Sequence, residues 1–149
     1  LIYKLEKLLQ LLKPDMTIFY QLLVNINLKE GDKVAWIDHL NDAFYKPLSD
    51  QQSLKLAEFL DEYKSLKENR AVATLQAAAL MQKANPRFIL RNYLLQEAID
   101  EIENGGSSKF MKLQEAIQAP YEDKFPEYFQ KRPDWAKTKA GCSMLSCSS

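Results

Sequence analysis

Apolar residues recur every three or four positions along most of the chain, and this spacing predicts amphipathic helices. The pattern is clear over residues 1–13, where polar side chains fall mostly on the opposite face of the predicted helix. A proline at position 14 ends it, because proline cannot continue a helix without losing a backbone hydrogen bond. The apolar positions of this first segment are Leu1, Leu5, Leu8, Leu9 and Leu12.

Start and stop signals divide the next part of the chain into further helices. Asp15 and Asp32 each precede an apolar segment, where an aspartate can accept hydrogen bonds from the free N–H groups of the first helical turn. Ser49 and Gln52 have the spacing of a capping box, in which each side chain bonds the other residue's backbone N–H. Later helices are predicted over 71–84, 85–102 and 108–119.

The predicted helix over 85–102 depends on an Asn-Pro start signal. Asn85 can serve as the N-cap, and Pro86 at the first helical position loses only an N–H that has no helical partner there. Two glycines after residue 104 can supply the left-handed residue that ends the helix. Its apolar residues cover an arc wider than a single stripe, so we expect burial on more than one side. They are Ile89, Leu90, Tyr93, Leu94 and Leu95.

The last thirty residues differ from the rest, because prolines interrupt any long helix and aromatic residues are frequent. A solvated tail rarely carries so many large apolar rings, so this segment is expected to pack along a surface. The sequence therefore predicts an all-α, irregular multi-helix array over 1–119 and an extended aromatic-rich arm over 120–149. The residues concerned are Pro120, Pro126, Pro133, Tyr121, Phe125, Tyr128, Phe129 and Trp135.

Composition narrows the classes of protein to consider. The chain has 149 residues, with 20 Lys+Arg against 20 Asp+Glu, and this zero net charge argues against a nucleic-acid binder. No apolar run of about 18 residues suggests a membrane span. Only four glycines are present, which disfavours a phosphate-cradling loop. The chain begins with Leu1 and shows no signal peptide, so we interpret it as a piece of a longer protein in preference to a mature product.

Most residues that could carry chemistry have a simpler interpretation. The single histidine, His39, has no second histidine or cysteine at ligand spacing, so we expect an ordinary, partly exposed side chain and not a metal ligand. General acid–base catalysis needs carboxylates in unlike environments, whereas the adjacent carboxylate pairs here lie in polar stretches and are expected to be solvated. These pairs are Asp61–Glu62, Asp100–Glu101 and Glu122–Asp123.

Two arginines and two cysteines leave more than one interpretation open. Arg87 and Arg91 would lie one helical turn apart in the predicted helix and could clamp an anion, although exposure or pairing with a neighbouring helix is favoured.

Cys147 lies among serines near the end of the sequence, where a mobile thiol is accessible to oxidants. It could pair with Cys142, but the short loop makes that geometry demanding. From the residues alone an inert tail is favoured over a redox role.

Three segments, in order, resemble a known family. Residues 85–99 read NPRFILRNYLLQEAI, residues 133–136 read PDWA, and residues 146–149 read SCSS. This order resembles the C-terminal region of the selenoprotein O family, the YdiU-type protein adenylyltransferases. Their members carry NP(K/R)(F/Y)(I/V)LRNYL, Pro-x-Trp-Ala and a terminal (S/C)-(C/U)-S-S, where U is selenocysteine. The match is close over 72–149 and looser over 1–71.

The resemblance also has departures. The family usually has Gly-Asp after this helix, where the present chain has Gly-Gly-Ser-Ser over 105–108, and Cys142 has no counterpart that we can map. Cys147 stands at the selenocysteine position. The resemblance therefore implies that Cys147 is a redox residue. Cys142 is a second redox candidate from the residues alone, because it could pair with Cys147.

The resemblance implies a kinase-like parent enzyme that binds ATP in a flipped orientation and transfers AMP to Ser, Thr or Tyr hydroxyls of proteins, assisted by Mg or Mn. The family's Gly-rich loop, Lys–Glu pair and metal ligands belong to the preceding part of the chain. No catalytic, cofactor-binding or metal residue is therefore assigned here, and this piece alone is expected to be inactive.

The expected partners are the N-terminal kinase-like part of the same polypeptide and the parent's protein substrates, with no nucleic acid and no membrane. The expected location is the cytoplasm of a bacterium, or the mitochondrion for a eukaryotic source. The alternative hypothesis is a free-standing helical module that binds a partner helix in an apolar groove.

Overall fold

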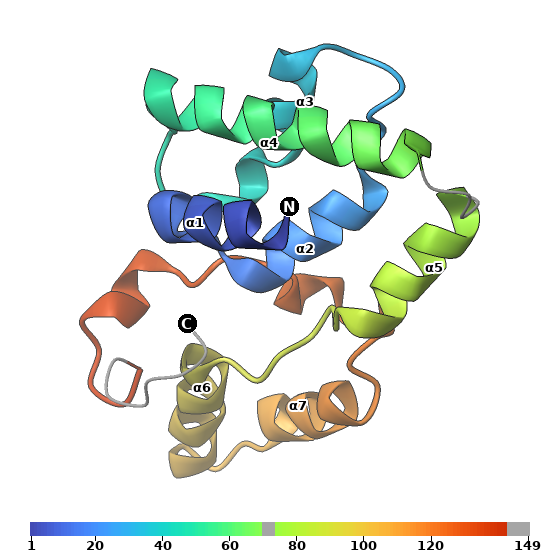
Figure 1. Ribbon diagram of the computed structural model, residues 1–149. Coiled ribbons are helices and arrows are strands. Elements are labelled where there is room, and N and C mark those ends of the chain that lie inside the picture. Colours follow the sequence, from blue (N-terminus) through green and yellow to red (C-terminus); the bar gives the residue numbers. More distant parts are fainter. Residues whose placement is uncertain (70–73, 143–149) are drawn as a thin grey trace. The chain divides into compact units, whose positions relative to one another are not determined.

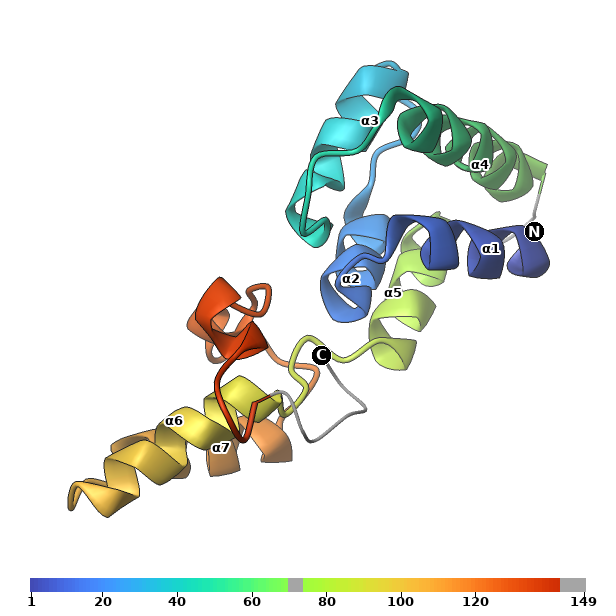
Figure 2. The same ribbon diagram turned by 90° about the vertical axis from the view of Figure 1, so that its left-hand side faces the viewer.

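A computed structural model describes residues 1–69 and 74–142 (Figures 1 and 2). Across these residues the chain forms α-helices and short 3₁₀ helices and no strand, which confirms the predicted all-α class. It divides into two compact units, Leu1–Asn85 and Pro86–Ser149, whereas the sequence suggested a change of character at residue 120. The α-helices are α1 (Ile2–Leu12), α2 (Met16–Asn25), α3 (Lys33–His39), α4 (Asp50–Asn69), α5 (Thr74–Ala84), α6 (Asn92–Glu103) and α7 (Ser108–Gln118).

The predicted helix starts in the first unit are confirmed. The Asp15 carboxylate accepts a hydrogen bond from the Ile18 N–H at 3.2 Å. Asp32 does the same for the Ala35 N–H at 3.0 Å. Lys13 ends α1 in the left-handed conformation, with φ of 48°. The bonds accepted by Asp15 and Asp32 satisfy backbone N–H groups that the first turn of a helix leaves without a helical partner.

The capping box at the start of α4 is also confirmed. The Ser49 N–H donates to Gln52 Oε1 at 3.0 Å, and the Gln52 N–H donates to Ser49 Oγ at 3.3 Å. The Gln52 amide then donates to the Leu11 carbonyl at 3.2 Å. This last bond links the start of α4 to the end of α1.

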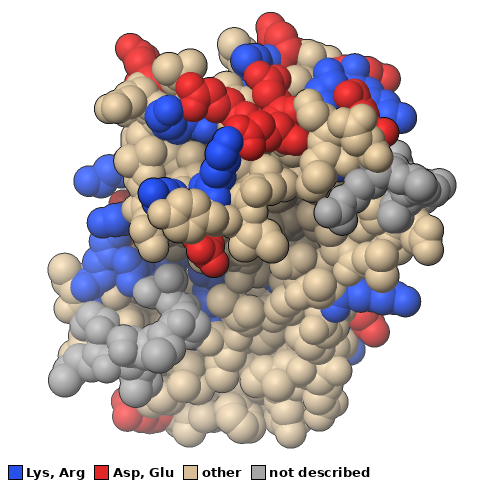
Figure 3. Space-filling model, in the orientation of Figure 1, with Lys and Arg blue, Asp and Glu red and all other residues tan. Residues whose placement is uncertain are grey.

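The core of the first unit forms where α1 and α3 pack against α4 and where α5 packs against α2. Among the largest fully buried side chains are Phe19, Leu40, Leu56 and Leu60. Gln21 is also buried, and its amide donates to the Asn85 carbonyl at 2.6 Å, so its burial leaves that donor satisfied. Charged side chains of both signs cover α4 in Figure 3.

The second unit is an α6–α7 hairpin with the C-terminal arm packed on it (Figure 1). Gly105 adopts φ of 85° after α6, as the sequence predicted. Leu94 and Ala98 on α6 share a buried cluster with Leu113 and Ala116 on α7. The arm contains two 3₁₀ helices, Pro126–Tyr128 and Asp134–Lys137, and its Phe125, Tyr128 and Ala136 belong to or pack against that cluster.

The predicted start of the 85–102 helix is wrong. Asn85 ends the preceding helix instead, because its backbone and side-chain N–H groups both donate to the Met81 carbonyl. The helix α6 begins only at Asn92, after Arg91 in an extended conformation. The chain before it pairs with the arm: the Arg87 and Phe88 N–H groups both donate to the Pro120 carbonyl, at 2.8 and 2.9 Å.

Two further expectations depended on a helix that begins at residue 85, and the structure changes both. Arg87 and Arg91 are not one helical turn apart, because no helix joins them. Arg91 is buried, with 3% of its surface exposed. Of the apolar residues expected to be buried, Tyr93 and Leu94 lie in the core, whereas Leu90 is 37% exposed.

Candidate functional site in the second unit

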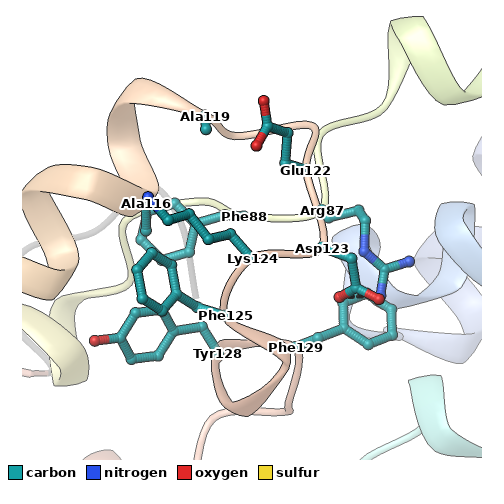
Figure 4. Close-up of a pocket in the computed structure, with 10 residues that line it drawn as sticks. All are labelled: Arg87, Phe88, Ala116, Ala119, Glu122, Asp123, Lys124, Phe125, Tyr128 and Phe129. Carbon is teal, nitrogen blue, oxygen red and sulfur yellow. Dashed lines mark hydrogen bonds and ion pairs between the residues drawn. The ribbon is translucent and has the colours of Figure 1, made fainter.

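Three aromatic rings join the beginning of the second unit to the arm. The Phe88 ring lies 5.5 Å from the Tyr128 ring, and the Phe125 ring lies 5.7 Å from the same tyrosine, measured between centroids. Figure 4 shows these three rings gathered on one side of a small hollow. Such tilted ring pairs add to the stabilisation that burial itself provides.

Arg87 forms the opposite side of the hollow. Its Nη2 lies 3.0 Å from Asp123 Oδ1, and its guanidinium stacks over the Phe129 ring at 4.7 Å. The three residues lie together in Figure 4. Arginine suits this arrangement because its flat cation can stack on a ring and bond a carboxylate at the same time.

The hollow itself is too small for a nucleotide or any other organic ligand. Its volume is about 10 Å³, which is room for about one water molecule. We therefore interpret this cluster as the clamp that holds the start of the arm. Its lining residues are Arg87, Phe88, Ala116, Ala119, Glu122, Asp123, Lys124, Phe125, Tyr128 and Phe129.

A second clamp holds the later part of the arm on α6. The Trp135 ring meets the Tyr93 ring edge-on at 6.1 Å. Lys139 lies over the Trp135 ring at 5.6 Å and forms an ion pair with Asp100. The Gln96 amide donates to the other oxygen of Asp100 at 2.8 Å. The aromatic and charged contacts thus reinforce each other along one face of α6.

The neighbouring carboxylates are held in their ionised form. The hydrogen bond from Lys139, followed by that from Gln96, lowers the pKa of Asp100. The bonds from the Ser108 hydroxyl and the Lys109 backbone lower the pKa of Glu101. A general acid needs a pKa near the working pH, so neither carboxylate is suited to that role, and both act as acceptors that hold the structure.

Cys142 lies at the end of the described arm and is buried, with 2% of its surface exposed. It belongs to the same cluster as Leu94, Leu113 and Ala136. A buried cysteine in such surroundings packs as a small apolar side chain. Cys147, the residue predicted to be redox-active, lies outside the described residues.

The turn before Cys142 requires glycine at position 141. Gly141 has φ of 85°, which side chains rarely adopt. A Cβ there would lie 2.1 Å from Gln96 Oε1. The arm therefore approaches the Gln96 side chain of α6 closely just before the buried cysteine.

The other candidates from the sequence are structural or exposed. His39 is exposed and its Nε2 lies 3.0 Å from the Leu22 carbonyl. Asp61 and Glu62 form ion pairs with Lys33 and Lys4. Within residues 1–69 and 74–142, no three His, Cys, Asp or Glu side chains are grouped to hold a metal ion, and no helix is long and apolar enough to cross a membrane.

Sequence reasoning missed Gln96, Lys139 and Gly141. Gln96 and Lys139 are 43 positions apart in the sequence and meet only through Asp100. The isolated glycine at position 141 was the one available signal, because such a glycine can mark a turn with positive φ or a close approach to another element.

Comparison with known proteins finds relatives that share one name. "Protein nucleotidyltransferase YdiU" of Cytophaga hutchinsonii is 42% identical over 149 residues, which cover the whole chain and 28% of that relative. The proteins of the same name from Xanthomonas oryzae pv. oryzae and Tolumonas auensis are each 38% identical over 152 residues, which cover the whole chain. These residues make up 29% of the Xanthomonas protein and 28% of the Tolumonas protein. No family model and no solved structure matches the chain.

Proposed function

Because the chain is YdiU-family sequence along its whole length, we propose that it is the C-terminal helical portion of a protein nucleotidyltransferase. In this proposal the whole enzyme transfers AMP from ATP to Ser, Thr or Tyr hydroxyls of proteins. The observation that carries it is the 38–42% identity, from end to end, to proteins named protein nucleotidyltransferases. The chain spans about 28% of the length of those relatives, so the activity is assigned to a longer protein.

The chemistry of the transfer is assigned to the part of the enzyme outside this chain. Mg or Mn would neutralise phosphate charge during the transfer. Carboxylate-rich ligand sets suit these ions, but the described residues contain no such group of three. The clamp around Arg87 holds a cavity of about 10 Å³, so it does not fit ATP. We therefore derive no catalytic step through these residues.

The role proposed for this chain is to pack on the kinase-like part and to present a redox-active cysteine. Cys142 is buried and Gly141 is pressed against Gln96, which supports a fixed starting point for the tail. Cys147 follows five residues later. Five extended residues span at most roughly 18 Å between Cα atoms, and a disulfide adds roughly 6 Å between the Cα atoms that it joins. The Cα of a partner cysteine must therefore come within roughly 24 Å of the Cys142 Cα.

The proposed redox step is thiol–disulfide exchange. The Cys147 thiol, reacting as its thiolate, attacks a low-molecular-weight disulfide, forms a mixed disulfide and releases one thiol, which takes up the proton lost by Cys147. A cysteine thiol of the kinase-like part then attacks the Cys147 sulfur of the mixed disulfide, forms the protein disulfide and releases the second thiol with its own proton. Reduction by excess thiol reverses the step. The new bond closes a long loop, so it restrains the tail strongly where its geometry is unstrained.

The test compares AMP transfer by the longer protein under oxidised and reduced conditions. The parent's activity should respond to the redox state, and a Cys147→Ser variant should not. Cys142→Ala is the matched control, because it removes the buried cysteine and leaves the tail cysteine in place, so it should still respond. An oxidant response that survives in Cys147→Ser would overturn the redox role.

A free-standing interaction module is the second candidate. The observation that favours it is the exposed apolar side chains on α7: Phe110 is 45%, Met111 53% and Ile117 49% exposed. The two proposals differ in the gene. A continuous upstream reading frame that encodes kinase-like sequence supports the enzyme, whereas a start codon directly before Leu1 supports the module.

A further inference from the structure

Helix α1 covers only part of the longer helix α4. The Lys4 ammonium pairs with Glu62, and the Gln52 amide donates to the Leu11 carbonyl at 3.2 Å. The two helices are therefore antiparallel, and the start of α1 lies beside the second half of α4. Because α4 continues for seven residues after Glu62 and α1 has only two before Lys4, the end of α4 extends past the start of α1 (Figure 1).

An open hollow lies where the start of α1 meets this second half of α4. Its volume is about 430 Å³. Leu1 and the half-buried Leu66 give the hollow an apolar part, and its other lining side chains are polar. A further turn of helix with one apolar side would suit such a surface. The lining residues are Leu1, Asp61, Glu62, Ser65, Leu66 and Asn69.

The apolar stripe of α1 becomes more exposed towards the first residue of the helix. Leu12 and Leu8 are 7% and 5% exposed, Leu5 is half-buried, and Leu1 is 40% exposed. These leucines share one face because they are spaced three and four residues apart. The stripe therefore ends beside the hollow with an apolar side chain that is only partly covered.

The first turn of α1 also has backbone donors to satisfy. Leu1 occupies the N-cap position, and its side chain makes no capping bond. The Leu5 N–H donates to the Leu1 carbonyl at 2.9 Å, whereas the N–H groups of Ile2, Tyr3 and Lys4 come too early in the helix to find a carbonyl four residues back within this chain. In a longer helix, the carbonyls of the three residues before Leu1 would accept these bonds.

We propose that the residues directly before Leu1 in the longer protein continue α1 by about one turn and pack that turn into the hollow on α4. This inference rests on the proposed function, which places a kinase-like part before this chain. Most of the length of the relatives lies outside the residues they share with it. A helical continuation satisfies the three N–H groups and covers Leu1 together, so a helix and not a flexible linker joins the first unit to the preceding part.

The test compares backbone hydrogen exchange in the longer protein and in the 149-residue chain. The amides of Ile2, Tyr3 and Lys4 should exchange about tenfold or more slowly in the longer protein, because they gain helical acceptors. The Ile18 amide is the control, because its bond to Asp15 is present in both proteins. Equal exchange of the first three amides in the two proteins would overturn the proposal. So would concentration-dependent protection in the 149-residue chain, because a second copy would then cover the hollow.

A pair of matched variants separates packing in the hollow from a helix that continues into solvent. Leu66→Ser in the longer protein removes the apolar contact and should abolish most of the added protection. Leu54→Ser makes the same change at a leucine of α4 that is 59% exposed and outside the hollow, and should leave the protection unchanged. An unchanged Ile18 amide shows that the unit remains folded. Full protection in Leu66→Ser would overturn packing in the hollow.

Transfer of AMP by the same longer protein is measured separately, so this inference and the proposed function can fail independently. Slow exchange at Ile2, Tyr3 and Lys4 in a protein that transfers no AMP would support the helical continuation and overturn the proposed function. Transfer of AMP by a protein in which these amides exchange as fast as in the 149-residue chain would overturn the helical continuation alone.

Discussion

Leu94 is the clearest test of the packing at the level of one residue. It lies on α6 with 5% of its surface exposed, in the cluster that joins the hairpin to the arm. Leu94→Ala should therefore lower the free energy of unfolding by about 2–5 kcal/mol, as core truncations do. Leu90→Ala is the matched control, because Leu90 is 37% exposed. A urea denaturation series measures both, and equal costs would contradict the described core.

Gly141 gives a second prediction for a single residue. Gly141→Ala should destabilise the second unit because alanine disfavours φ of 85° and its Cβ would overlap Gln96. Gly105→Ala is the control: its φ is the same, but nothing lies within 4 Å of the added Cβ. Thermal unfolding should show the larger loss for Gly141→Ala. Gln96→Ala removes the bond to Asp100 in either background, so it should cost less stability in the Gly141→Ala variant than in the parent chain. Equal costs in the two backgrounds would mean that the arm does not approach α6 there.

At the scale of elements, the sequence was sufficient to predict helix starts that depend on hydrogen bonds within one helical turn. Asp15, Asp32 and the Ser49–Gln52 box bond N–H groups three residues away, so residue identity and spacing were sufficient. The Asn-Pro signal failed because a distant partner decides the conformation there. The Arg87 and Phe88 N–H groups bond the Pro120 carbonyl, and no local pattern shows that contact.

The clamp between α6 and the arm should respond to acid. The pKa of Asp100 is below its ordinary value of 3.8 in the folded chain, chiefly because of Lys139. Its contribution to stability is therefore present above pH 4 and is lost as the pH falls through the lowered pKa. When the pH is lowered from 6 to 3, the free energy of unfolding should fall less for the Asp100→Asn variant than for the parent chain.

Glu122→Gln is the control for that experiment, because it removes a carboxylate from the arm that forms no ion pair within the described residues. It should lose as much stability as the parent between the two pH values, measured by urea denaturation at each. An Asp100→Asn profile identical to the parent's would mean that the Lys139–Asp100 contact contributes nothing to folding.

At the scale of the whole molecule, the sequence predicted the all-α class, and the described residues confirm it. Of the arm's aromatic residues, Phe125 and Tyr128 pack against the core of the second unit, whereas Tyr121 and Trp135 are about half exposed. It did not predict the division at Asn85, because that boundary depends on which helices pack together. The candidate site was only partly predictable. Cys142 was noted, but its burial depends on Ala136 and the α6–α7 hairpin, and Cys147 lies outside the described residues.

The central proposal is that this chain is the non-catalytic C-terminal portion of a protein nucleotidyltransferase. The most direct measurement incubates the longer protein, and separately the 149-residue chain, with ATP labelled on the α- or the γ-phosphate, and follows label on protein. We predict that the longer protein transfers only the α-label and that the chain alone transfers neither. Transfer of the γ-label by the longer protein, or of either label by the chain alone, would contradict the account.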